Sequence, residues 1–211
     1  MVPFFMWVKE GKAPNRQGGF TQSMTELKLS LQGMLKRPSL FSFMGAQMFY
    51  RDALNGLYAF GGVYAALVLG WGLTQLGVFG IIGGISAALV TWVSGKYDRK
   101  LGPRPVIYFH IWVLIIVSLC IIGMSRTSFY GIALPVDSNL PDIIFYICGA
   151  AIGGSGGGIY AASRSMMVRH TNMARPTEAF GLFALAGKAT AFLAPLLIGL
   201  FTYWLNDARL G

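Results

Sequence analysis

The sequence predicts an all-α membrane protein, a polytopic bundle of about five transmembrane helices, and composition and hydropathy patterning carry that prediction. Hydrophobic residues make up 55% of the 211 positions and charged residues only 12%, whereas a soluble domain carries about 25% charged residues. The mean hydropathy is +0.57, and long apolar runs are separated by short polar stretches. These observations exclude a soluble globular domain.

The apolar runs define the expected spans, because a membrane helix needs roughly 20 consecutive apolar residues. The predicted spans form one bundle over 41–204 and cover residues 41–69, 74–94, 105–124, 142–162 and 179–204. Pro195 lies inside the last span and removes one backbone donor, so we expect that helix to bend.

Three further segments flank this bundle. Residues 1–8 are apolar but too short to span a membrane, and we interpret them as the end of a truncated transmembrane helix. Residues 9–40 are expected to form a cytoplasmic loop, with an amphipathic helix where Met and Leu recur every three or four positions over 24–35. Residues 205–211 are expected to form an extracytoplasmic tail.

Basic residues are concentrated in alternate connections. The stretches 9–37, 95–104 and 164–175 hold 13 of the 17 Lys and Arg residues. The predicted spans place all three stretches on one side of the membrane, and the positive-inside rule makes that side cytoplasmic. The net charge of +9 therefore reflects topology and attraction to anionic lipid, and no nucleic-acid partner is expected.

The first span contains a polar stripe that a lipid-facing helix would not tolerate. Four polar side chains follow one another at spacings of four, four and three: Gln47, Arg51, Asn55 and Tyr58. They share one helix face, which Asp52 flanks. A charge at bilayer depth costs roughly 2.5–3.5 kcal/mol on insertion scales. We interpret the face as lining a water-filled cavity; the alternative is an internal salt bridge or packing network.

Lys188 is the deep cation of the fifth span. Its stem can snorkel to the cytoplasmic interface, or its ammonium group can pair with Asp52 or bind an anionic group on a solute. Asp52 is the only carboxylate deep in a predicted span, which makes it the candidate for proton coupling. Glu178 marks the mouth of the fifth span and is expected at the interface.

The connection after the second span combines glycines with charges: Gly95, Asp98, Arg99, Gly102 and Arg104. Glycine permits a tight reversal of the chain. The Asp98 carboxylate can accept from helix amides or pair with an arginine. We expect a short loop whose contact holds one conformation closed and breaks in another.

The fourth span is rich in glycine, with Gly149, Gly153, Gly154, Gly156, Gly157 and Gly158. A phosphate-binding loop is excluded, because the GKS or GKT ending and a preceding strand are missing. Small residues at this spacing allow helices to pack closely in lipid, so the cluster predicts tight helix packing.

These segments resemble a known family. The stretch 95–104 resembles the signature loop between the second and third helices of each half of a major facilitator superfamily transporter. The run FYRDALNGLYAFGGVYA at 49–65 and the region 151–199 are similar to the branch of the autophagy-associated vacuolar amino-acid effluxer and its bacterial relatives. The matching residues are Tyr50, Asp52, Gly95, Asp98, Gly102, Ser163, Arg164, Ser165, Glu178–Gly181, Gly187–Lys188 and Pro195. The resemblance covers about residues 38–200.

The resemblance implies that the five spans are helices seven to eleven of a twelve-helix transporter. The N-terminal half would then be a missing partner, and the chain would be a fragment of a secondary transporter. Such a carrier moves small organic solutes, amino acids favoured, by alternating access across a lipid bilayer. The bilayer would be the cell membrane of a bacterium or the vacuolar membrane of a fungus.

The resemblance and the spacing together give the candidate site residues. The pathway set is Gln47, Tyr50, Arg51, Asp52, Asn55, Tyr58 and Lys188. The conformational set is the five residues of the 95–104 connection, and the cytoplasmic set is Ser163, Arg164, Ser165 and Glu178.

Two other function classes explain the sequence less well than a transporter does. A membrane enzyme needs clustered His, Asp or Cys residues with metal or nucleophile spacing; the sequence has no such cluster, so neither catalysis nor a metal or cofactor is expected. A structural subunit of a larger complex would explain the glycine-rich faces but not Arg51, Asp52 and Lys188 at depth. A complete five-span protein is the alternative to a fragment.

Overall fold

The computed structural model describes residues 25, 37–135, 138–170 and 176–205, with side chains in the last range described from 179 onward. The expected truncated helix at 1–8 and the tail after 205 lie outside the described residues. The expected amphipathic helix does too, apart from Thr25.

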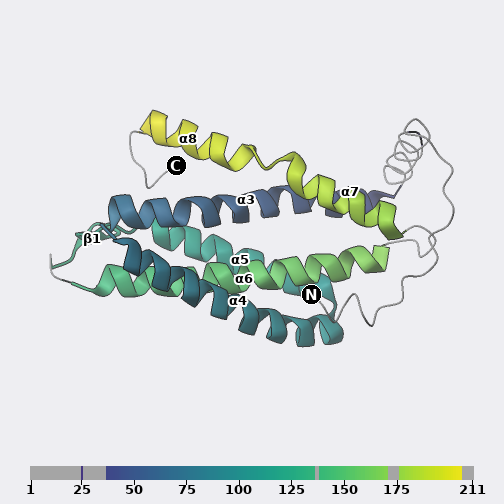
Figure 1. Cartoon of the computed structure of the whole chain (residues 1–211), viewed down its shortest axis with the longest axis horizontal. Coiled ribbons are helices and arrows are strands. Elements are labelled where there is room, and N and C mark those ends of the chain that lie inside the picture. Colours follow the sequence, from purple (N-terminus) through teal and green to yellow (C-terminus); the bar gives the residue numbers. More distant parts are fainter. Residues whose placement is uncertain (1–24, 26–36, 136–137, 171–175, 206–211) are drawn as a thin grey trace, which may run out of the picture.

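The all-α prediction is confirmed. The helices are α3 (Pro38–Val68), α4 (Leu73–Leu101), α5 (Pro103–Ile122), α6 (Leu140–His170), α7 (Pro176–Ala189) and α8 (Leu193–Leu205). They run side by side along the long axis of the molecule (Figure 1). The sequence did not predict the small antiparallel hairpin between α5 and α6, formed by β1 (Ser128–Phe129) and β2 (Ile132–Ala133).

Four stretches of the described chain are long and apolar enough to cross a membrane: Leu73–Leu101, Pro103–Ile122, Leu140–His170 and Ala179–Leu205. The last stretch contains both α7 and α8. Helix α3 is as long as α6, at 31 residues, but its charged and amide side chains interrupt the apolar sequence. It lies among the other helices, in contact with α4, α6, α7 and α8.

The centre of the fold is α6, and its glycines are the reason. Side chains added at Gly149, Gly153 and Gly157 would overlap α4, and one added at Gly158 would overlap His110 of α5. Without Cβ atoms at these positions, α6 lies almost backbone to backbone against α4. The glycine-packing prediction is therefore confirmed.

The second span extends further than the sequence analysis expected. Residues 95–101 form the last turns of α4, and only Gly102 separates α4 from α5. Gly102 has φ +87°, a conformation that glycine adopts without steric cost, and Pro103 then begins α5. The predicted loop at 95–104 is thus wrong: helix α4 runs through it, because a single glycine suffices to reverse the chain.

The fifth span is broken, and Pro195 explains where. Helix α7 ends at Ala189 and α8 begins at Leu193. The backbone N–H groups of Ala191 and Leu193 donate to carbonyls three residues earlier, which is the tighter spacing of a 3₁₀ turn. Pro195 has no N–H for the carbonyl four residues before it. The predicted bend is confirmed as a complete interruption of the helix.

The two ends of the bundle differ in charge. The basic end is where α4 and α6 finish, with Arg99 and Lys100 in the last turn of α4 and Arg169 in the last turn of α6. The opposite end carries the α3–α4 turn and the hairpin (Figure 1).

Candidate functional site

Most of the predicted pathway residues lie along one boundary, which we call the polar seam. On α3 it consists of Gln47, Tyr50, Arg51, Asp52 and Asn55, and each of them contacts α6, α7 or α8. The spacing of these residues on α3 gives the seam its length, since residues three or four apart lie one above the other.

Arg51 occupies the middle of the seam. Its guanidinium carbon lies 5.3 Å from the ring centre of Tyr160 on α6 and 5.5 Å from that of Phe183 on α7. A Cβ at Gly187 of α7 would overlap the guanidinium, so the glycine makes room for it. Cation–π contacts of this kind contribute about 0.5–2 kcal/mol. They offset part of the roughly 2.5–3.5 kcal/mol cost of a charge at depth.

Asp52 makes a contact that sequence reasoning did not anticipate. Its side chain is buried, with 4% of the residue exposed, and its Oδ2 accepts a hydrogen bond from the backbone N–H of Ala194 at 2.8 Å. Ala194 is the second residue of α8, where N–H groups lack partners within the helix. The carboxylate thus caps the broken fifth span from another helix, where the helix dipole favours negative charge. Oδ1 has no partner among the described residues.

The remaining seam residues tie α3 to its neighbours. The buried Gln47 donates from Nε2 to the carbonyl of Phe183 at 2.9 Å. The hydroxyl of Tyr50 lies 2.6 Å from that of Ser163. Tyr160 donates to Asn55 Oδ1 at 3.4 Å. Gln47 and Tyr50 are enclosed between helices, so in this conformation they connect helices instead of facing an open cavity.

Two predicted pathway residues lie apart from these contacts. Tyr58 is 47% exposed, next to Gly156 of α6. Lys188 is exposed, and no ion pair joins it to Asp52 within the described chain. The structure therefore does not show the pairing of Lys188 with Asp52 that the sequence left open.

A recess of about 500 Å³ lies beside the seam, between α3, α4 and α6. It is apolar and glycine-rich, and its wall does not include Arg51 or Asp52. Its lining residues include Leu57, Tyr58, Gly62, Leu76, Phe79 and Gly83.

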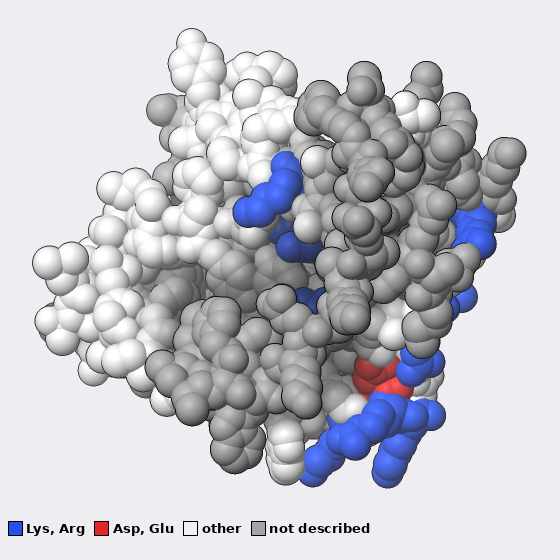
Figure 2. All heavy atoms as spheres, turned by 45° about the vertical axis from the view of Figure 1, so that its right-hand side comes forward, with Lys and Arg blue, Asp and Glu red and all other residues white. Residues whose placement is uncertain are grey.

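At the basic end, the structure brings Asp98 of α4 to Arg169 of α6. The Arg169 Nη2 lies 3.5 Å from Asp98 Oδ1 and 3.4 Å from the Asp98 carbonyl. The Arg169 side chain is 53% exposed, so this is a weak surface contact. Figure 2 shows basic side chains grouped around an acidic one on this face. The partner of Asp98 is thus an arginine from a neighbouring helix.

The other predicted residues of the basic end are spread over three helices. Gly95 and Arg99 lie in α4, where Arg99 Nε donates to the Gly95 carbonyl at 3.4 Å, and Arg104 is exposed in the first turn of α5. Residues 164–170, expected in a cytoplasmic connection, are helical instead, because α6 continues to His170. Ser163, Arg164 and Ser165 are therefore helical. Glu178 lies in the first turn of α7, and its side chain is outside the described part.

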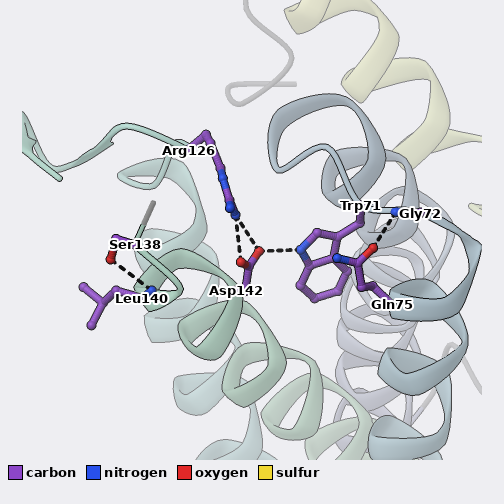
Figure 3. A network of polar contacts seen from close by, with 7 residues as sticks. All are labelled: Trp71, Gly72, Gln75, Arg126, Ser138, Leu140 and Asp142. Atoms are coloured by element: carbon purple, nitrogen blue, oxygen red, sulfur yellow. Dashed lines mark hydrogen bonds and ion pairs between the residues drawn. The ribbon is translucent and has the colours of Figure 1, made fainter. Parts of the chain in front are cut away.

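Sequence reasoning missed a polar network at the opposite end (Figure 3). Asp142, in the first turn of α6, binds Arg126 at 2.7 and 2.8 Å and accepts from the indole of Trp71 at 2.6 Å. Trp71 also stacks on Tyr146, with ring centres 4.5 Å apart. One signal was available in the sequence. Arg126 is the only Lys or Arg in the predicted connections 70–73 and 125–141, on the side opposite the basic stretches, and an acid begins the following span.

A second missed contact lies inside the α4–α5–α6 group. His110 is 3% exposed, and its Nε2 lies 2.8 Å from the hydroxyl of Ser94. Gly158 provides the space for its ring. An isolated histidine in an apolar run gives no sequence signal for its partner, because that partner is set by helix packing.

Comparisons with known proteins agree with this architecture. The model of the family described as "Vacuole effluxer Atg22 like" matches residues 1–211. The uncharacterized MFS-type transporter YxiO of Bacillus subtilis (strain 168) is 24% identical over 176 residues, which are 83% of this chain and 37% of the relative. The chain thus spans little more than a third of that relative's length. No solved structure matches the chain. The family match includes every described helix, and four stretches are able to cross a bilayer. The chain belongs to the vacuole effluxer Atg22 like family and is an integral, multi-pass membrane protein.

Proposed function

We propose that this chain is part of a secondary transporter that moves small organic solutes by alternating access, with the polar seam as part of the path. Membership in an effluxer family and similarity to an MFS-type transporter support this proposal. Amino acids or related metabolites are the solutes that the resemblance described in the sequence analysis favours. The relative's greater length supports a second half that completes the path.

The observation that carries the proposal is the cap that Asp52 provides to α8. In many carriers, helices are interrupted near the bilayer midplane, and the ends of the half-helices bind ions or charged groups. Here Pro195 and the turn after α7 interrupt the fifth span, and a buried carboxylate from α3 meets the free N–H of Ala194. The negative charge on Asp52 thereby stabilises the contact between α3 and α8.

This geometry supports coupling of transport to protons. A protonated Asp52 is a weaker acceptor than a carboxylate and no longer complements the helix dipole. Protonation therefore weakens the contact between α3 and α8, and deprotonation restores it. Within the described chain, the charged or titratable groups on the helices of the seam include Arg51 and Tyr50 of α3, Tyr160 of α6 and Lys188 of α7, and none of them makes a hydrogen bond or ion pair with the carboxylate.

Asp52→Asn tests the proposal, since the amide keeps the shape and an acceptor oxygen but cannot ionise. The whole protein that the cell makes is purified and reconstituted into liposomes. Uptake of a radiolabelled amino-acid mixture is then measured with and without a proton gradient. We expect gradient-driven accumulation to disappear while exchange at equal pH persists. Asp52→Glu, which keeps the charge, and Asp98→Asn, at the basic end, are the controls. Unchanged accumulation in Asp52→Asn would refute the coupling role.

A non-transporting structural subunit is the second candidate, and one observation favours it. Gln47 is fully buried at 0% exposure and donates to a backbone carbonyl of α7. Thr190, in the turn after α7, donates to the Met48 carbonyl of α3. A scaffold would use such ties permanently. In that case Asp52→Asn alters assembly, and neither the wild type nor the variant moves solute in liposomes.

A further inference from the structure

Among the described residues, no acid pairs with Arg51. Of the described acidic side chains, Asp52 binds the Ala194 amide, Asp98 lies near Arg169 and Asp142 binds Arg126. No described group accepts a hydrogen bond from the guanidinium, and its Nε is sealed from solvent without a partner.

Its depth makes this lack of a partner informative. Arg51 lies 13 residues after the start of α3, or about 20 Å along the axis at 1.5 Å per residue. A cation at such a depth pairs with another group or faces a water-filled cavity. In this structure the head group does not extend along its stem to the end of α3: it lies close to the rings of Tyr160 and Phe183 and against Gly187.

The guanidinium has donors that no described group accepts. Tyr160 and Phe183 contact it through their aromatic rings. The donors of an arginine lie along its planar edge, in a fork that matches a carboxylate through two parallel hydrogen bonds. Nε is buried, but no described group occupies the terminal amino nitrogens.

We propose that Arg51 is the anion-binding residue of this protein. Its guanidinium, which lies beside Tyr160, Phe183 and Gly187, binds the carboxylate of a transported solute. This inference rests on the proposed function, since it names the group of the solute that the path recognises. A carboxylate fits because it is planar and lies in the plane of the guanidinium fork.

Protection of Arg51 from chemical modification tests this anion-binding site without requiring transport. The intact wild-type polypeptide in detergent is treated with phenylglyoxal, which modifies arginine, and the modification of each arginine is followed by mass spectrometry. The probes are propionate and its neutral isostere propionamide, with phosphate and chloride as further arms. At a propionate concentration about ten times its apparent Kd, the rate at Arg51 is expected to fall by about tenfold, since only the free site reacts.

The control position is Arg164, an exposed arginine of α6, whose rate should not change. Protection by propionamide equal to that by propionate would overturn the proposal, as would protection by phosphate or chloride alone. Complete absence of phenylglyoxal modification at Arg51 would overturn the proposal too, because a solute-binding site must be reachable from water.

Two variants separate recognition from folding. Arg51→Lys keeps the charge but loses the planar fork, and Arg51→Gln loses the charge. Both should lose the thermal stabilisation by propionate that the wild type shows, while keeping cooperative unfolding in its absence. Persisting stabilisation in Arg51→Gln would contradict the proposal. Because this equilibrium assay uses no proton gradient, a failure here is distinct from a failure of Asp52→Asn.

Discussion

The two halves of the bundle are held together by different means. Helices α4, α5 and α6 interlock through glycines of α6, which pack against α4 and against His110 of α5. Helices α7 and α8 contact α3 through the hydrogen bonds of the polar seam and through apolar side chains such as Phe183. Backbone-to-backbone packing leaves no alternative arrangement, whereas a few hydrogen bonds can be exchanged one at a time. The contrast indicates a rigid α4–α5–α6 group and a seam able to open.

The comparison is tested most severely at Gly153. A Cβ there would overlap the carbonyl and Cα of Gly83, and a backbone cannot rotate away as a side chain can. We expect Gly153→Ala to destabilise the protein by about 1–3 kcal/mol or more, measured as a lower thermal unfolding midpoint in detergent.

Gly84→Ala is the matched control, because nothing lies within 4 Å of a Cβ at that position. Replacing glycine by alanine in an open helical position contributes about 0.5–1 kcal/mol of stability. A Gly153→Ala protein as stable as the control would show that α6 is not interlocked with α4.

The network of Figure 3 fastens the opposite end of the rigid group to the α3–α4 turn. In Asp142→Asn, the ion pair with Arg126 is lost while the hydrogen bond from Trp71 can remain. Charged hydrogen bonds contribute about 1.5–3 kcal/mol; the Arg126 side chain is 38% exposed, so solvent screening reduces the expected loss to about 1 kcal/mol.

Unfolding midpoints in low and high salt measure this loss. Ser138→Ala, which removes only a 3.2 Å bond from the Leu140 amide, serves for comparison and should change stability by less than about 0.5 kcal/mol. Equal effects of the two changes would mean that Asp142 has no special role.

The seam itself is probed by Thr190→Val, a change of nearly equal volume. Thr190 donates to the carbonyl of Met48 at 3.1 Å, and its loss should cost about 0.5–1.5 kcal/mol. Hydrogen exchange followed by mass spectrometry should show faster exchange in α7 and α8 and none of that increase in α6. Thr202→Val, at a position without a described hydrogen bond, is the control; an equal increase in α6 would contradict a separate seam.

The smallest effect is expected at the basic end. Arg169→Gln removes a 3.5 Å contact between partly exposed groups, which contributes at most about 0.5 kcal/mol. Its midpoint should match that of Arg99→Gln and should not depend on salt. A loss above about 1 kcal/mol would show that Asp98 and Arg169 close this end of the bundle more firmly than their exposure indicates.

The sequence identified the helices and the seam residues but not their partners. Apolar runs and the stripe at Gln47, Arg51 and Asn55 are properties of single helices, because transfer into a bilayer depends on each segment alone. The Asp52–Ala194 bond joins positions 142 residues apart. No local pattern could predict this hydrogen bond, because the N–H of Ala194 lacks a partner within its own helix only where Pro195 interrupts that helix.

The boundaries show the same division. Basic residues at 95–104 and 164–175 correctly marked one end of the bundle, but they also led to loops where α4 and α6 continue as helices, since Lys and Arg are good helix formers. The hairpin and the Trp71–Asp142–Arg126 network depend on where three connections meet at the opposite end, which no single connection reveals.

By itself, the sequence determined that this is a multi-helix membrane protein with ions at depth and glycines for close packing. Those features follow from the free energy of each side chain in lipid. Only the tertiary structure decided that Asp52 caps a broken span and that Arg51 stays unpaired among aromatic rings. Those outcomes depend on how neighbouring helices are rotated and how closely they approach.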